Sequence, residues 1–85
     1  MPTVAFTSHL RQHAPPHPVP VEADTVGAAL RAVFRQHPRL ESYVLDDQKQ
    51  LRRHVVVFVD AERATLDQKV GPGAEIMVFQ ALSGG

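Results

Sequence analysis

Residues 71–85 of this chain read Gly71-Pro72-Gly73-Ala74-Glu75-Ile76-Met77-Val78-Phe79-Gln80-Ala81-Leu82-Ser83-Gly84-Gly85. Glycine and proline in alternation at 71–73 predict a chain reversal. The four apolar residues at 76–79 predict a strand that is apolar on both faces. This strand runs directly into a narrow terminal segment, which predicts a folded body followed by a thin flexible tail at 81–85.

The two terminal glycines are a candidate chemical handle. Glycine has no Cβ, so its backbone enters a slot that other residues would block. An α-carboxylate has a pKa of roughly 3.3–3.7 and is ionised at neutral pH, which makes it a poor electrophile. Activation with ATP would convert it into an acyl adenylate that sulfur or nitrogen nucleophiles attack. The alternative is a frayed chain end or a cloning remnant without function.

Composition excludes several classes of function. The 85 residues make one domain, and their 44% apolar content is typical of a globular protein. Nine basic and nine acidic residues cancel, which argues against a nucleic-acid or membrane partner. The chain has no cysteine, so thiolate catalysis and cysteine zinc sites are excluded. With no membrane-length apolar stretch and no signal peptide, we expect a cytoplasmic protein.

The first half of the chain predicts two strands and one helix. Residues 4–10 alternate as a strand, and the proline-rich residues 11–20 form a loop leading to a short edge strand around 19–22. Asp24 or Thr25 caps a helix whose one face is apolar and which ends near Pro38. The residues on that face are Val26, Leu30, Val33, Phe34 and His37.

The second half predicts two further strands. Residues 40–45 are expected to be extended or irregular, and residues 46–48 and 60–63 to be turns. The five apolar residues at 55–59 predict a strand that is apolar on both faces. One helix covers only one face of the resulting mixed sheet. The other face remains apolar and uncovered, which usually marks a partner surface.

Three segments of the chain form a recognisable series: Val57-Phe58-Val59-Asp60, the stretch 71–79, and Ala81-Leu82-Ser83-Gly84-Gly85. Together they resemble the MoaD/ThiS family of ubiquitin-like sulfur carriers. The resemblance implies an α+β, β-grasp (ubiquitin-like) fold, with a mixed sheet and one main helix packed on one face. Residues 1–85 would form a single domain of this kind, including the flexible tail 81–85.

The resemblance also implies a chemistry centred on Gly85, with Gly84 giving steric clearance. A ubiquitin-activating-type adenylyltransferase would adenylate the Gly85 carboxylate with ATP, and a sulfurtransferase system would convert it to a thiocarboxylate. A sulfur-accepting synthase would then receive the sulfur, for molybdopterin, thiazole, another metabolite or tRNA. The chain itself would be a carrier without a bound cofactor or an active site of its own.

Strand alternation and the ubiquitin-like pattern give expectations for the faces of the sheet. Ile76 and Val78 are expected to point inward, and Met77 and Phe79 outward. On the neighbouring strand, Val56 and Phe58 are expected inward and Val57 outward. The expected partner surface is therefore Val57, Met77, Phe79, Ala81, Leu82 and Ser83. In the alternative reading, Met77 and Phe79 belong to the core.

The sequence is also compatible with two other functions. The same adenylate, attacked by a lysine amine, would make the chain a ubiquitin-like protein modifier. A non-carrier interaction subunit would leave the glycines idle. Residues 11–20 and 39–53 are longer than a minimal carrier needs, so the pathway stays open.

The remaining polar clusters have simpler interpretations. His9, His13 and His17 recur every four residues, but the prolines between them exclude a helix and we expect no metal site. Adjacent Asp46 and Asp47 fit a turn better than paired acid–base catalysis.

The basic residues Lys49, Arg52, Arg53 and His54 fit a solvated strand end. Ser83 has no histidine or aspartate partner in its sequence context.

Overall fold

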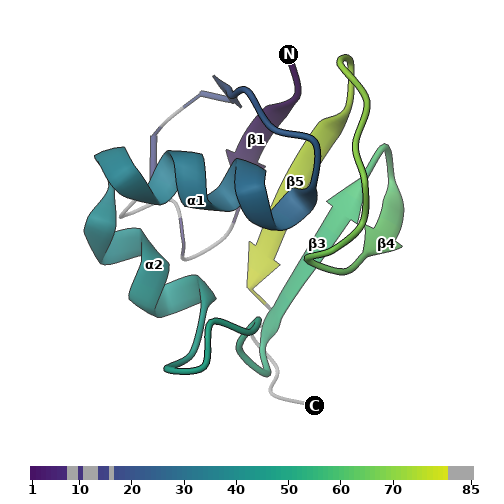
Figure 1. The fold of residues 1–85 in the computed structure, drawn as a ribbon. Coiled ribbons are helices and arrows are strands. Elements are labelled where there is room, and N and C mark those ends of the chain that lie inside the picture. The colour runs from purple at the N-terminus through teal and green to yellow at the C-terminus, as the bar shows by residue number, and fades with distance from the viewer. Residues whose placement is uncertain (8–9, 11–13, 16, 81–85) are drawn as a thin grey trace.

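The structure is a computed structural model that describes residues 1–7, 10, 14–15 and 17–80. Five strands form one sheet: β1 (Thr3–Phe6), β2 (Val19–Pro20), β3 (Val55–Val59), β4 (Glu62–Ala64) and β5 (Glu75–Gln80). Their order is β2-β1-β5-β3-β4, and β1 is parallel to β5 whereas the other neighbours are antiparallel. The last strand in the sequence is therefore the middle strand of the sheet (Figure 1).

Helix α1 (Val26–Gln36) confirms the predicted helix and its cap. The Thr25 hydroxyl accepts a hydrogen bond from the Ala28 amide at 3.1 Å, which satisfies one of the free donors of the first turn. The amides of Val26 and Gly27 donate instead to the carbonyls of Gln68 and Leu66, at 3.0 and 2.7 Å. The segment after β4 thus holds the start of α1, and it does so by backbone contacts.

A second helix, α2 (Pro38–Val44), occupies the segment that was expected to be extended or irregular. That expectation is wrong because Pro38 both follows the end of α1 and begins a second helix. Proline lacks an amide hydrogen, but the first position of a helix needs none, so Pro38 can also begin a helix. Leu40 and Val44 are four residues apart and are both buried, which docks α2 on the core.

The turns follow the sequence prediction more closely than the edge strands do. Asp46 accepts hydrogen bonds from the amides of Gln48 and Gln50, as expected for a turn-forming aspartate. Asp60 and Ala61 have positive φ angles of 49° and 71° and turn the chain between β3 and β4. The expected turn at 60–63 was too long, because Glu62 and Arg63 already pair with β3.

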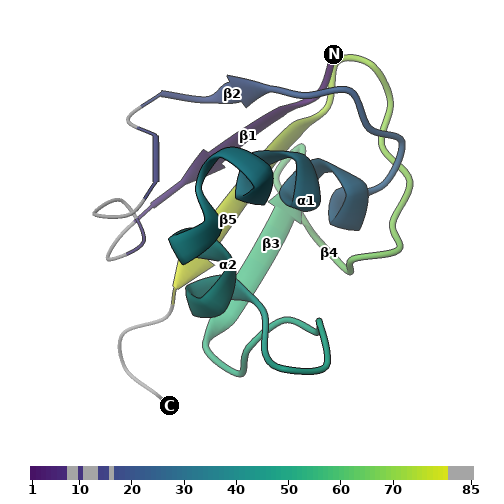
Figure 2. The same cartoon turned by 60° about the vertical axis from the view of Figure 1, so that its left-hand side comes forward.

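Both helices lie on the same face of the sheet (Figures 1 and 2). The core fills the space between the helices and the sheet, and among the described residues it contains only apolar side chains. Its largest fully buried side chains are Leu10, Leu30, Leu40, Ile76, Val4, Val26, Val33, Val44, Val57 and Val78. Within the described part of the chain, neither helix has the length and apolar character that crossing a membrane requires.

Candidate functional site: the open apolar face

Alternation along β3 and β5 divides their side chains between two environments. Val55, Val57 and Val59 of β3 are buried, as are Ile76 and Val78 of β5. The intervening residues Val56, Phe58, Met77 and Phe79 are half-buried and point to the face without helices. We call these four residues the open apolar face.

The register places the members of this face side by side. Val56 lies opposite Phe79, and Phe58 lies opposite Met77. The rings of Phe58 and Phe79 meet edge to face, with centroids 5.3 Å apart and planes at 85°, an arrangement that aromatic pairs favour. With Ala61 and Glu75, three of the four residues (Phe58, Met77 and Phe79) line an open hollow of about 380 Å³.

The expected directions were right for β5 and wrong for β3. Met77 and Phe79 point outward and Ile76 and Val78 inward, as expected. Val57, however, is only 1% exposed, so it cannot belong to a partner surface. It lies directly opposite Val78, and residues opposite each other in a sheet share a face. The outward residues of β3 are therefore Val56 and Phe58.

Charged residues border the open apolar face on two sides. Arg63 of β4 lies opposite Phe58 and shares its face. Glu75 lies at the start of β5, and its backbone amide donates a hydrogen bond to the Asp60 carboxylate at 3.0 Å. Ala5 of β1 lies opposite Met77 and extends the apolar surface toward the other edge.

The candidate reactive residues follow this face in the sequence. Gln80, the last described residue, lies opposite Val55 at the end of β5. Gly84 and Gly85, expected to carry the chemistry, lie outside the described residues, as do the expected contacts Ala81, Leu82 and Ser83. The structure thus describes the surface that leads to these residues, and their roles stay predictions.

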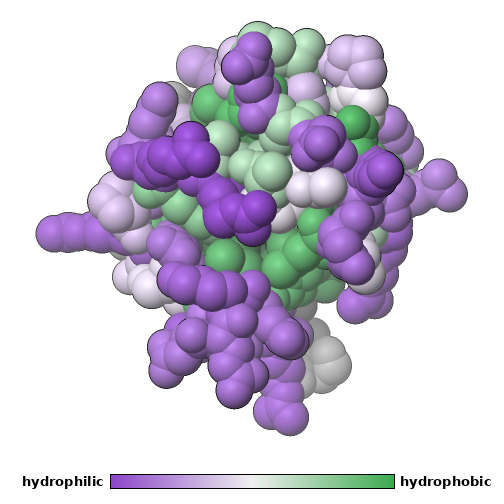
Figure 3. Space-filling model, in the orientation of Figure 1, coloured by the Kyte–Doolittle hydropathy of each residue, from purple (hydrophilic) through white to green (hydrophobic). Residues whose placement is uncertain are grey.

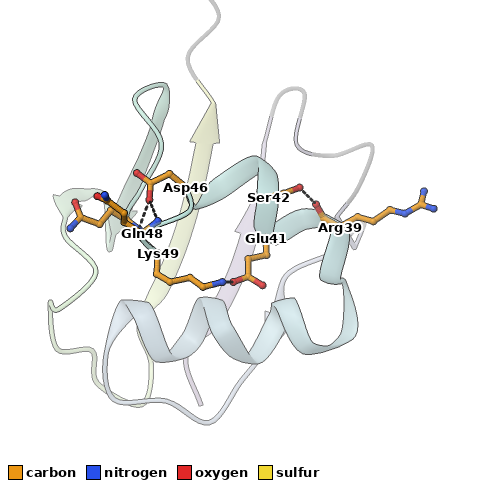
Figure 4. A network of polar contacts seen from close by, with 7 residues as sticks. Arg39, Glu41, Ser42, Asp46, Gln48 and Lys49 are labelled. Carbon is orange, nitrogen blue, oxygen red and sulfur yellow. Dashed lines mark hydrogen bonds and ion pairs between the residues drawn. The ribbon is translucent and has the colours of Figure 1, made fainter.

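The helix-bearing side differs in chemistry. Hydrophilic residues gather at the lower end of Figure 3, over the connection between α2 and β3. There Lys49 Nζ lies 2.8 Å from Glu41 Oε2, and the hydrogen bond and the charge of Glu41 raise the pKa of Lys49. Ser42 donates to the Arg39 carbonyl nearby (Figure 4). This network is solvent-exposed and stabilises a connection, so we assign it no chemistry.

Nor do the described residues bring together a metal site. No group of three histidine or acidic side chains converges within the described part of the chain. His17 is exposed, and His9 and His13 lie outside the described residues. The carboxylates of Asp46 and Asp60 accept hydrogen bonds from backbone amides and so stabilise the local backbone.

Comparisons with known proteins agree with this geometry. Residues 5–85 match the model of the ThiS family. The chain is 41% identical over 68 residues to small archaeal modifier protein 1 of Haloferax volcanii, which covers 79% of this chain and 78% of that protein. The crystal structure of that modifier is similar with a TM-score of 0.84 and 34% identity, covering 99% of this chain and 98% of the other.

A more distant likeness concerns the fold alone. A chain in the crystal structure of the Amycolatopsis orientalis BexX/CysO complex matches with a TM-score of 0.85 and 24% identity, and each chain is covered completely. Together with the mixed five-stranded sheet, these likenesses confirm the expected β-grasp fold.

Proposed function

Because the chain belongs to the ThiS family, we propose that it is a sulfur carrier whose reactive group is the Gly85 carboxylate. Its relatives are ubiquitin-like proteins, among them a small archaeal modifier. The observation that supports the proposal most is the open apolar face on β5, the central strand that leads toward residues 81–85.

The proposed chemistry has two steps. The ionised Gly85 carboxylate attacks the α-phosphorus of ATP, a new C–O–P linkage forms, and pyrophosphate leaves. A sulfur nucleophile supplied by a sulfurtransferase then attacks the carbonyl carbon, the acyl–oxygen bond breaks, and AMP leaves. Where this nucleophile is a persulfide, the product is an acyl disulfide. A thiol then attacks the donor sulfur, the S–S bond to the chain breaks, a new disulfide forms on the donor, and the chain leaves as the thiocarboxylate. In this scheme the chain is a substrate of partner enzymes, and ATP binds to the activating adenylyltransferase.

Docking on the activating enzyme would use the open apolar face. Half-buried aromatic and methionine side chains on one surface are typical of the centre of a protein interface. Phe79 is one residue before Gln80, so a partner that covers this face also reaches the start of segment 81–85. A sulfur-accepting synthase could use the same face after activation. The acceptors that fit this chemistry are precursors of molybdopterin or thiazole, another metabolite, and tRNA.

Intact-mass spectrometry tests the proposal directly. The chain is incubated with an activating adenylyltransferase from the same organism, ATP and a sulfur donor. We expect a mass increase equal to the replacement of one oxygen by sulfur, located in the tryptic fragment 70–85. Omission of ATP and deletion of Gly84 and Gly85 serve as controls. An unchanged mass with an enzyme that activates other substrates would contradict the proposal.

A second candidate function is protein modification, which the 41% identity to a small archaeal modifier protein favours. Here a lysine amine of a target attacks the same adenylate, an amide bond forms, AMP leaves and the amine releases a proton. Tagged chain expressed in cells would then run as high-mass adducts that disappear when Gly85 is deleted. If the deletion changes neither adducts nor sulfur transfer, the chain is a non-carrier subunit.

A further inference from the structure

A second hollow, of about 550 Å³, runs along β3, β4 and the segment that follows β4. Its lining combines an apolar part with four charged side chains. Leu51, Val56 and Leu66 contribute to the apolar part. The charged residues are Arg52, Arg53, Arg63 and Asp67. In a chain whose net charge is zero, three arginines against one aspartate make a local excess of positive charge. We call this hollow the arginine groove.

Two of the three arginines have no partner in the described part of the chain. Arg52 Nε donates to the Ser42 carbonyl at 2.6 Å, so this side chain supports the connection between α2 and β3. The side chains of Arg53 and Arg63 form no hydrogen bond or ion pair with any described residue, and both residues are exposed. Their guanidinium groups are therefore available to acceptors outside the chain.

The arginine groove adjoins the open apolar face and lies near Gln80, the end of the described chain. Val56 lines the groove and also belongs to the open apolar face. Arg63 lies opposite Phe58 and shares its side of the sheet. Arg53 comes two residues before Val55, which lies opposite Gln80, where the described chain ends before Gly84 and Gly85. A partner that covers the open apolar face would thus extend naturally over the groove.

From this placement we infer that Arg53 and Arg63 bind an acidic segment of the activating enzyme while its apolar residues cover Phe58 and Phe79. The inference rests on the proposed function and adds the chemistry of the partner. Carboxylates of a protein partner fit better than a nucleic-acid backbone, because the chain has no net positive charge and the groove is half apolar, whereas nucleic-acid partners need a broad basic surface. Guanidinium groups bind carboxylates in a two-pronged geometry, which would also fix the orientation of the partner.

The effect should appear in the encounter of the two proteins and not in the chemical step. Exposed charges at the rim of an interface mainly change the association rate and its dependence on salt. Their influence extends over about 10 Å at an ionic strength of 0.1 M and shrinks as salt is added. Charge reversal at Arg53 and Arg63 should therefore raise KM for the chain, leave kcat unchanged and lose its effect in high salt.

The experiment measures ATP-dependent pyrophosphate release by the activating enzyme as a function of the concentration of the chain. The test variant is R53E/R63E, and the matched control is R35E/R39E, which reverses two exposed arginines on the helix-bearing side. At low salt we expect kcat/KM to fall about tenfold or more for R53E/R63E and less than about twofold for the control. Thermal unfolding of both variants checks that they fold.

The possible results separate the two levels of the proposal. If the wild-type chain gives no pyrophosphate release, the proposed function fails and the inference fails with it. If the wild-type chain is activated and R53E/R63E matches the control at low salt, only the inference is overturned. Retarded migration of an RNA oligonucleotide that R53E/R63E abolishes, with activation unchanged, would also overturn it and assign the groove to nucleic acid.

Discussion

The two faces of the sheet are built from the same strands and nearly the same residue types, yet one is covered by the helices and the other is open (Figure 1). On β3, Val57 is buried under the helices and its neighbour Val56 is half-buried on the open side. On β5, Ile76 and Val78 belong to the core, whereas Met77 and Phe79 remain accessible. Apolar side chains therefore form the core on one face and, in our proposal, a docking surface on the other, and only the register tells them apart.

The adjacent valines of β3 offer the strongest test of this difference. In Val57→Asp, a carboxylate without a partner would be buried in the core, at a cost of about 3–5 kcal/mol. A domain of this size has a total stability of about 5–10 kcal/mol, so we expect Val57→Asp to lose a large part of its stability. Val56→Asp places the same group where water reaches it and should cost about 1–2 kcal/mol.

Urea unfolding followed by circular dichroism measures both variants. Equal losses of stability at the two positions would contradict the division into a covered and an open face. The two variants are well matched: both replace a valine of β3 with aspartate at adjacent positions, and the two side chains differ in the side of the sheet that they face.

Phe79→Ala should have the opposite signature, a modest loss of stability and a large loss of binding. The ring is half-buried and forms one edge-to-face contact with Phe58, a contact that contributes about 0.5–1.5 kcal/mol. If the open apolar face contacts the activating enzyme, truncation of its central ring should weaken binding by about 2 kcal/mol or more, roughly thirtyfold. Titration calorimetry with the enzyme measures this loss.

Tyr43→Ala is the matched control for that experiment. Tyr43 is an aromatic residue of α2 on the helix-bearing side and is 42% exposed. Its removal should leave the affinity within about twofold, as for most residues outside an interface. If the two variants lose equal affinity, the open apolar face is not the docking surface.

The sequence was sufficient to predict the elements with strong local signals. Helix α1 has a capping threonine, four-three spacing of apolar residues and a proline after its end, and the structure agrees to within a residue. The directions of Met77 and Phe79 were also predicted correctly. The roles of Gly84 and Gly85 depend on residues outside the described part of the chain, so the structure neither supports nor opposes them.

Two of the wrong predictions, on β3 and β4, arose where the sequence has no local signal. Residues 55–59 of β3 (Val55-Val56-Val57-Phe58-Val59) are all apolar, so the sequence does not show which of them face the core. The inward residues are set by the pairing of Val57 with Val78, which is distant in the sequence. Strand β4 was missed because its three residues are mostly polar and pair only at the sheet edge. Arg53 and Arg63 gained significance only when the fold placed them beside one groove.

A variant at the N-terminal cap of α1 tests whether the helices that cover the sheet contribute only to stability, unlike the open apolar face. Thr25→Ala removes the hydroxyl that accepts from the Ala28 amide and should cost about 1 kcal/mol. The midpoint of urea unfolding should fall with an unchanged slope, and the rate of activation should not change. Ser42→Ala, which removes an exposed hydroxyl bonded to the Arg39 carbonyl, should have a smaller effect. A slower activation of the folded Thr25→Ala chain would show that the covered side also takes part in recognition.

The smallest expected effect concerns the ion pair between Lys49 and Glu41, which lies on the helix-bearing side but in solvent. The Lys49 side chain is 71% exposed, so below pH 10 we expect Lys49→Gln to unfold at nearly the wild-type urea concentration. The hydrogen bond and the charge of Glu41 raise the pKa of Lys49 above 10.5. A raised pKa in the folded state adds stability that is complete below the unfolded value and is lost as the pH rises through the folded value. The small difference between wild type and Lys49→Gln should therefore vanish only above about pH 10.5. A large difference at neutral pH would mean that the covered side owes its stability to surface charge as well as to its apolar core.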